Sequence, residues 1–363
     1  MLITPPSLGY AHYIDWRTLA LLSMFMLCTA GLQEAGAIQS VAHGLLERAG
    51  SCRAVVAALV ALPFFASMLV TNDVSLLAFV PLSLTMLASR KDLLPLTLTL
   101  QTIAANAGSF LTPFGNPQNL YVYSAFNVGF GEFLLAQLPF VLLNGLLLAA
   151  LVCFAGRSGE ITGRRDGGSS DIGDTAGRRG RGSSDILASA PRPERPADIE
   201  GTHSRTLLYA ALFVLSVLAV LRVIPVAIAF ALVVAAVIVA QKRLFLQIDW
   251  VLLLTFVLFF IFSGNLVHSG ISAQGDFLVT MGASQIISNV PATILLAPFS
   301  TDWQALSLGA NVGGFGTPVG SLASLITIGL YRHAGGELKP LFKAFLPLNF
   351  AFLAINCLLY ALI

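Results

Sequence analysis

The sequence predicts an all-α polytopic membrane protein built from two inverted repeats. Its composition is the first evidence: 56% of the 363 residues are hydrophobic and only 10% are charged, against about 25% charged in a typical soluble domain. The mean hydropathy is +0.83. Several apolar stretches reach or approach the roughly 20 residues that cross a hydrocarbon core. The clearest are 17–32, 206–221, 224–240, 250–267 and 341–363.

A polar segment divides the chain. Residues 157–205 are rich in Gly, Ser, Arg, Asp and Pro and cannot bury a core. Within them, 163–172 recurs with small changes as 177–186, which is typical of low-complexity expansion. We therefore predict a disordered linker over 156–204, between a first repeat at 15–155 and a second at 205–363.

The two halves share three motifs in the same order. An Asp-Trp pair opens an apolar span, an Asn lies at the tip of a hairpin, and a Gly-Thr-Pro-rich segment breaks a helix. Residues 106–120 and 311–325 are identical at seven of fifteen positions, including Asn, Thr, Pro and Gly. Shared apolar composition does not produce such identities. The motifs are Asp15-Trp16 and Asp249-Trp250, the tips at 71–75 and 288–292, and the breaks at 106–119 and 311–324.

The expected elements follow in order. Residues 15–36 cross once, and 51–89 form a hairpin of two arms that meet at Asn72. In the second hairpin the first arm, 277–287, is long enough for only about half of the bilayer, so we expect re-entrant hairpins. Five crossings separate the two Asp-Trp starts, which places the repeats in opposite orientations. The remaining crossings are 93–127, 130–155, 206–221 and 224–240.

The basic residues give an independent test of this topology. With residue 15 outside, all Lys and Arg except Arg17 and Arg222 face the cytoplasm, which is eighteen of twenty, as the positive-inside rule requires. The linker is then cytoplasmic and the C-terminus outside, in a bacterial inner (plasma) membrane. The second repeat has two spans before its Asp-Trp helix and the first has none, so the first repeat lacks about two N-terminal helices.

Asn, Thr, Pro, Gly and Ser cluster where helices should cross the membrane centre. Irregular backbone is tolerated in lipid only where it is buried in protein or lines a cavity. Carbonyls of a broken helix can coordinate a cation, and its half-helix N-terminus can face an anion. The alternative is that small and polar residues merely pack helices. The predicted binding residues are Thr71, Asn72, Asp73, Asn106, Gly108, Thr112, Gly115, Asn116, Ser288, Asn289, Asn311, Gly313, Thr317, Gly320 and Ser321.

Asp73 breaks the symmetry of the two tips. It follows Asn72, whereas Val290 follows Asn289. A carboxylate at the bilayer centre costs at least about 2.5–3.5 kcal/mol on insertion scales. We predict that Asp73 is the coupling residue, which binds Na⁺ or carries a proton. The alternative is a neutral or paired carboxyl that locks the hairpin.

These motifs resemble the ion transporter superfamily, which includes arsenite permeases, NhaD-type antiporters, citrate transporters and divalent-anion symporters. The resemblance is carried by both tips and by the loops 112–119 and 317–323. It is closest to the arsenite permease branch and its uncharacterised anion-permease relatives. It implies an elevator mechanism, a homodimer, and cation and substrate sites at Asn72 and Asn289, where Na⁺ is the metal ion that would bind. The symporters carry Ser-Asn-Thr at both tips, whereas this chain carries Thr-Asn-Asp at one and Ser-Asn-Val at the other. The difference bears on two-sodium coupling and dicarboxylate binding.

We therefore expect a secondary active permease for a small anion or metalloid oxyanion, coupled to H⁺ or Na⁺. The alternatives are a Na⁺/H⁺ antiporter, a channel, or an inactive truncated copy. Catalytic motifs such as HExxH and Gly-x-Ser-x-Gly are absent from the sequence, so we predict no enzyme and no cofactor. The expected partners are the lipid bilayer, the substrate and the coupling ion, and not nucleic acid.

Overall fold

The computed structural model describes residues 8–37, 40, 44, 46, 51–162, 199–270 and 275–363. All regular elements in these residues are helices, and five are long and apolar enough to span a membrane. The prediction of an all-α polytopic membrane protein is confirmed. The five spans lie in α7 (Phe130–Thr162), α9 (Ile199–Val220), α10 with the following turn (Val226–Leu246), α11 (Trp250–His268) and α16 (Leu338–Leu362). Residues 163–198 of the predicted linker lie outside the described residues.

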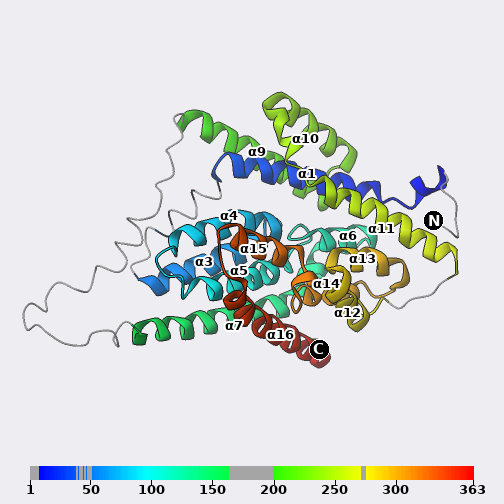
Figure 1. Ribbon diagram of the computed structural model, residues 1–363. Helices are drawn as coiled ribbons and strands as arrows, with labels where there is room; N and C mark the ends of the chain where they lie inside the picture. Colours follow the sequence, from blue (N-terminus) through cyan, green and yellow to red (C-terminus); the bar gives the residue numbers. More distant parts are fainter. Residues whose placement is uncertain are drawn as a thin grey trace, which may run out of the picture.

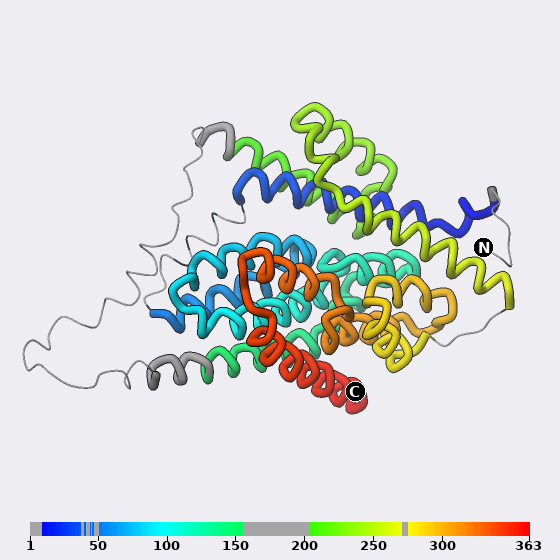
Figure 2. The backbone as a smooth tube through the Cα atoms, viewed as in Figure 1, coloured from blue at the N-terminus to red at the C-terminus, as the bar shows by residue number. Residues whose placement is uncertain are grey.

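The helices form two layers (Figures 1 and 2). One layer contains α9, α10 and α11 packed around α1 (Trp16–Glu34). The other contains the hairpins, the broken helices, α7 and α16. The layers meet where α1 contacts α6 and α11 contacts α13. The second-layer helices are α3 (Cys52–Ala66), α4 (Asn72–Met86), α5 (Leu94–Ser109), α6 (Pro117–Ala125), α12 (Phe277–Ile287), α13 (Asn289–Leu296), α14 (Trp303–Gly313) and α15 (Leu322–His333).

Helices α1 and α11 repeat the same local structure. Asp15 and Asp249 cap them, accepting hydrogen bonds from the backbone amides of Thr18 (3.0 Å) and Leu252 (2.8 Å). Such caps satisfy amides that a helix start leaves without a partner. Each following Trp indole donates to a carbonyl five residues back, at 3.1 and 2.9 Å. Gly36 and Gly270 follow the two helices with φ of 70° and 73°, a conformation that glycine adopts without a steric penalty.

Helix α1 includes the stretch 17–32 but is not among the five candidate spans. Unlike α11, it is buried along most of its length, because α9 and α10 pack against it. Cys28 on α1 lies 3.6 Å from Ser216 of α9, measured from Sγ to Oγ. The opposite membrane orientation of the two repeats stays a prediction.

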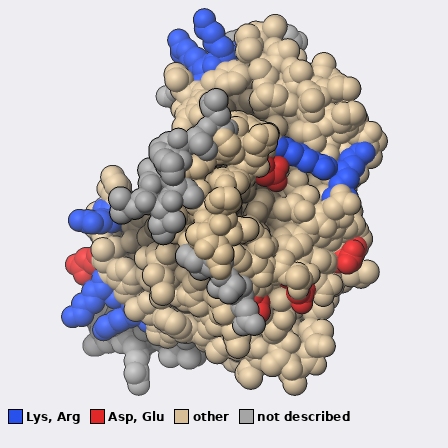
Figure 3. Space-filling model, turned by 90° about the vertical axis from the view of Figure 1, so that its right-hand side faces the viewer, with Lys and Arg blue, Asp and Glu red and all other residues tan. Residues whose placement is uncertain are grey.

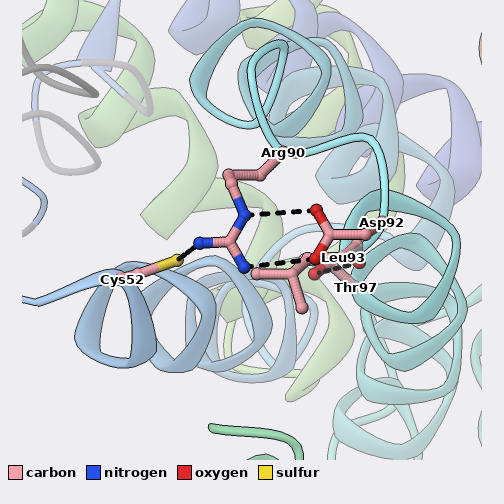
Figure 4. A network of polar contacts seen from close by, with 5 residues as sticks. All are labelled: Cys52, Arg90, Asp92, Leu93 and Thr97. Carbon is pink, nitrogen blue, oxygen red and sulfur yellow. Dashed lines mark hydrogen bonds and ion pairs between the residues drawn. The ribbon is translucent and has the colours of Figure 1, made fainter. Parts of the chain in front are cut away.

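The hairpins differ in length, as the arms of 51–89 and 277–287 do in the sequence. Helices α3 and α4 have 15 residues each, whereas α12 and α13 have 11 and 8. Figure 4 shows the end of the first hairpin opposite its tip, where Arg90 forms an ion pair with Asp92 at 3.1 Å and points a further nitrogen at Cys52. The hydrogen bonds that Arg90 donates to the Asp92 carboxylate hold the pKa of Asp92 below its ordinary value.

Both broken helices resume at a capped N-terminus. Helix α5 ends at Ser109 and α6 begins at Pro117, where proline needs no amide partner. The Asn116 side chain caps α6 by accepting from the Asn119 amide at 2.8 Å. After α14, the short 3-10 helix η4 (Pro318–Gly320) leads to α15, whose cap is Ser321.

Charged side chains are few on the face drawn in Figure 3, where most of the described surface consists of other residue types. The five candidate spans expose large apolar side chains, among them Leu146 on α7 (72%) and Val251 on α11 (75%). Surfaces of this kind are suited to lipid rather than to water.

We expect Gly108→Ala to destabilise the protein by about 1–3 kcal/mol, the usual cost of overpacking. A Cβ at Gly108 would lie 1.9 Å from the carbonyl oxygen of Phe64, so α3 and α5 would have to separate. The measurement is the folded fraction in detergent after heating, followed by size-exclusion chromatography. The control is Gly131→Ala on α7, where a Cβ meets nothing within 4 Å. Equal melting of the two variants would contradict this prediction.

Candidate functional site

The tip of the first hairpin contacts the first helix break. The Asn72 backbone amide donates to the Gly115 carbonyl at 3.0 Å, and its side-chain Nδ2 donates to Asn106 Oδ1 at 3.0 Å. Thr112 of the Thr-Pro loop donates its hydroxyl to the Met68 carbonyl at 2.6 Å. These bonds hold the start of α4 against the gap between α5 and α6.

The second hairpin and second break meet through an equivalent contact. The Thr317 hydroxyl donates to the Gln285 carbonyl at 2.9 Å. Met68 and Gln285 each lie four residues before the Asn of their tip. The Gln285 side chain adds bonds that have no counterpart among the described residues of the first half. They run from Nε2 to the Gly313 carbonyl (2.8 Å) and from the Thr317 amide to Oε1 (2.8 Å).

The two tip asparagines are oriented alike. Each is about 4% exposed, and each accepts on Oδ1 from the next backbone amide, at 3.0 Å from Asp73 and 2.9 Å from Val290. Ser288 precedes Asn289 with φ of 73°, an uncommon conformation for a residue other than glycine. Such strain concentrates at functional sites.

The two broken helices are linked to each other by exchanged contacts. Asn106 Oδ1 accepts from the hydroxyl of Ser321, the cap of α15, at 3.1 Å. Asn311 Oδ1 accepts from Nδ2 of Asn116, the cap of α6, at 3.1 Å. Asn106 and Asn311 are equivalent in the alignment of the halves, as are Asn116 and Ser321. Each half therefore orients the half-helix N-terminus of the other half.

Further buried amides extend this network. Asn311 Nδ2 donates to Asn119 Oδ1 (2.9 Å) and Gln137 Oε1 (3.2 Å), and Gln137 donates to Ser307 at 3.0 Å. Gln137 and Gln285 are not among the binding residues predicted from the sequence. The available signal was a single Gln within an apolar stretch, since polar side chains in membrane helices usually bond to a neighbouring helix.

A cavity of about 320 Å³ lies between the two layers beside this network. Tip 1 contributes Thr71 and Asp73, the α6 cap contributes Asn116, and α15 contributes Leu322 and Ile326. The other wall is α1 with the start of α11. Its polar residues are Thr29, Gln33, Gln247 and Asp249. Gln33 also donates to the Val74 carbonyl of α4 at 3.1 Å.

Asp73 lies in the first turn of α4, where a negative charge is favoured by the helix dipole. Its Oδ1 atom is buried without a hydrogen-bond partner among the described residues. A buried polar atom without a partner is costly and calls for an explanation, such as an ion or a proton.

The structure brings only three of the predicted site residues, Thr71, Asp73 and Asn116, to this cavity. Among the described residues, none of tip 2 lines it. Most of the others form the supporting contacts above. Three of the predicted glycines allow close approach of neighbouring segments. Gly108 lies against Phe64, Gly313 against Ser284, and Gly320 against the Gly313 carbonyl.

Many apolar helices, two hairpins packed on broken helices, and a cavity between the layers that includes carboxyl and amide groups define a multi-pass membrane permease. The chain belongs to the citrate transporter family, because the sequence model of that family matches residues 1–305. The predicted membership of the ion transporter superfamily is confirmed.

Three relatives illustrate the similarity. The inner membrane protein YbiR of Escherichia coli is 29% identical over 337 residues, covering 87% of this chain and 80% of the relative. The uncharacterized transporter MJ0456 of Methanocaldococcus jannaschii is 29% identical over 331 residues, covering 88% and 82%. The silicon efflux transporter LSI3 of rice (Oryza sativa) is 33% identical over 142 residues, covering 39% and 29%.

Proposed function

We propose that this permease is a secondary active transporter for a small anion or metalloid oxyanion, driven by H⁺ or Na⁺. The observation that carries the proposal is the cavity between the layers, because a buried carboxyl oxygen of Asp73 lies at it with no partner among the described residues. A bound Na⁺ or a proton would satisfy that oxygen, so filling the cavity and binding the coupling ion become linked events.

An elevator movement would slide the hairpin layer along α1 and α11. In support, apolar side chains dominate the contact of α1 with α6 and of α11 with α13. Polar contacts between the layers include the bond from Gln33 to Val74 and those from Arg222 to the carbonyls of Tyr123 (3.3 Å) and Asn127 (3.4 Å). Few bonds would have to break. Assembly as a homodimer, a cytoplasmic linker and an outside C-terminus belong to the same proposal.

The cavity lining favours a substrate with little net charge. Its described residues include two carboxyl groups, Asp73 and Asp249, and no Lys or Arg. The N-termini of α6 and α15 supply only partial positive charge. A tricarboxylate such as the citrate of the family description would bring three negative charges to this lining. A protonated metalloid oxyacid fits better, and the name of the rice relative points to the same class.

Na⁺/H⁺ exchange without an anion is the second candidate. Two carboxyl groups at one cavity without a basic residue among its described lining can exchange cations on their own.

The test is transport in proteoliposomes under an imposed Na⁺ or pH gradient. Arsenite, silicate, sulfate, succinate and citrate are supplied in turn. We expect saturable, gradient-dependent uptake of arsenite or silicate and none of citrate. Citrate uptake alone would contradict the charge argument, and Na⁺-driven proton flux without any of these solutes would favour the antiporter.

A further inference from the structure

A second cavity, of about 580 Å³, lies between α3 and α7 on the side away from α1. We call it the α3–α7 groove. Its described lining is apolar except for the thiol of Cys153. It includes Val60 and Phe64 of α3, Met68 in the turn after α3, and Gly145 and Val152 of α7. Lining residues such as Phe65 (63% exposed) and Leu146 (72%) lie open at the surface.

At the equivalent position of the second repeat, two aromatic rings pack against each other. Phe277 of α12 stacks on Tyr360 of α16, with ring centroids 3.7 Å apart. Val60 and Phe277 each precede the tip Asn by twelve residues. Pro139 of α7 and Pro347 of α16 are each the tenth residue of their helix, and Val152 and Tyr360 each follow that proline by thirteen residues. The groove therefore lies where two valines replace the aromatic pair.

We propose that the acyl chain of a membrane phospholipid fills the α3–α7 groove. Helix α7 is one of the candidate spans, so a groove along its surface opens into hydrocarbon. An empty groove of this size would forfeit dispersion contacts on all of its walls, and a lipid tail restores them as the aromatic pair does in the second repeat.

The charge at one end of the groove fits the headgroup of the same lipid. Ala57 of α3 and Cys153 of α7 both line that end. Arg53 lies one helical turn before Ala57 and is exposed, and positions four apart share a helix face. A tail in the groove thus places a phosphate near the Arg53 guanidinium, a favoured pairing.

The opposite end of the groove reaches the contact between the first hairpin and the loop 112–119. Met68, which lines the groove, accepts the Thr112 hydroxyl on its carbonyl. Phe64 lies in the wall, and its carbonyl packs against Gly108. The bound tail therefore supports α3 from the lipid side, opposite the contacts that position Asn72.

The test replaces the two valines by the aromatic residues of the second repeat, in the double variant Val60→Phe/Val152→Tyr. Delipidated protein is titrated with phosphatidylglycerol, and retained lipid is counted by native mass spectrometry. We expect wild type to retain one phospholipid that the variant lacks, with at least about a tenfold difference in affinity, since excluding a few buried methylene groups is enough. We also expect this lipid to raise the melting temperature of the wild type only.

Two further variants keep the test decisive. Leu254→Phe/Leu258→Tyr adds rings to the exposed face of α11 (56% and 52% exposed) and should retain lipid as the wild type does. Ala149→Trp blocks the groove from α7 alone, in case the double variant does not fold. Equal lipid retention in wild type and in folded groove variants would overturn the proposal.

Discussion

Asp73→Asn is expected to reduce gradient-driven transport to the level of protein-free vesicles. An amide cannot release a proton and lacks the negative charge that Na⁺ requires, so solute binding at the cavity loses its link to the gradient. The substitution keeps the size of the side chain and removes a buried carboxyl whose Oδ1 has no partner among the described residues. The melting temperature should therefore stay equal or rise.

The measurement is uptake in proteoliposomes for wild type, Asp73→Asn and Asp302→Asn. Asp302 caps α14 and does not appear in the described lining of the cavity, so its variant should lose some stability but keep coupled transport. Unchanged gradient dependence in Asp73→Asn would show that this carboxyl serves only to hold the hairpin.

Asn311→Leu should strongly reduce the amount of folded protein. The Asn311 side chain bonds to Asn116, Asn119 and Gln137, all buried. Leucine would remove one partner from each of these groups and would leave Gln137 Oε1 with none among the described residues. A buried group left unsatisfied costs about 1–3 kcal/mol. The folded fraction in detergent, read by size-exclusion chromatography, measures the effect.

Asn349→Leu is the matched control, because Asn349 is equally buried, and among the described residues its Nδ2 bonds only to Phe345 of its own helix. We expect Asn311→Leu to be the less stable variant by more than about 2 kcal/mol. A similar loss in the two variants would mean that the bonds between the broken helices add little.

Local chemistry made much of this fold predictable. Asp before Trp predicts a helix start, and both pairs do cap helices. Pro and Gly in 106–119 and 311–324 predict interrupted helices, and the helices end at Ser109 and Gly313. These features depend on residues close together in the chain, so a pattern within one segment reveals them.

Other features depend on partners far apart in the chain. The bond between Asn106 and Ser321 joins residues 215 positions apart, and the motifs of two separate repeats do not reveal that one half bonds to the other. Gln137 and Gln285 carry no motif, so their roles became visible only once their partners were placed.

The sequence by itself determined that this chain is an all-helical membrane protein of a transporter superfamily, with paired hairpins and breaks. The length of an apolar stretch, a helix cap and a proline each act on neighbouring residues in the chain, and the duplication repeats these signals in both halves. Only the tertiary structure decided which polar groups face a cavity. The cavity opens beside Thr71 and Asp73 but not beside Asn289, and α1 with residues at the start of α11 forms its other wall. The presence of the α3–α7 groove also depends on the tertiary structure, because whether a valine leaves a void depends on the side chain that packs opposite it.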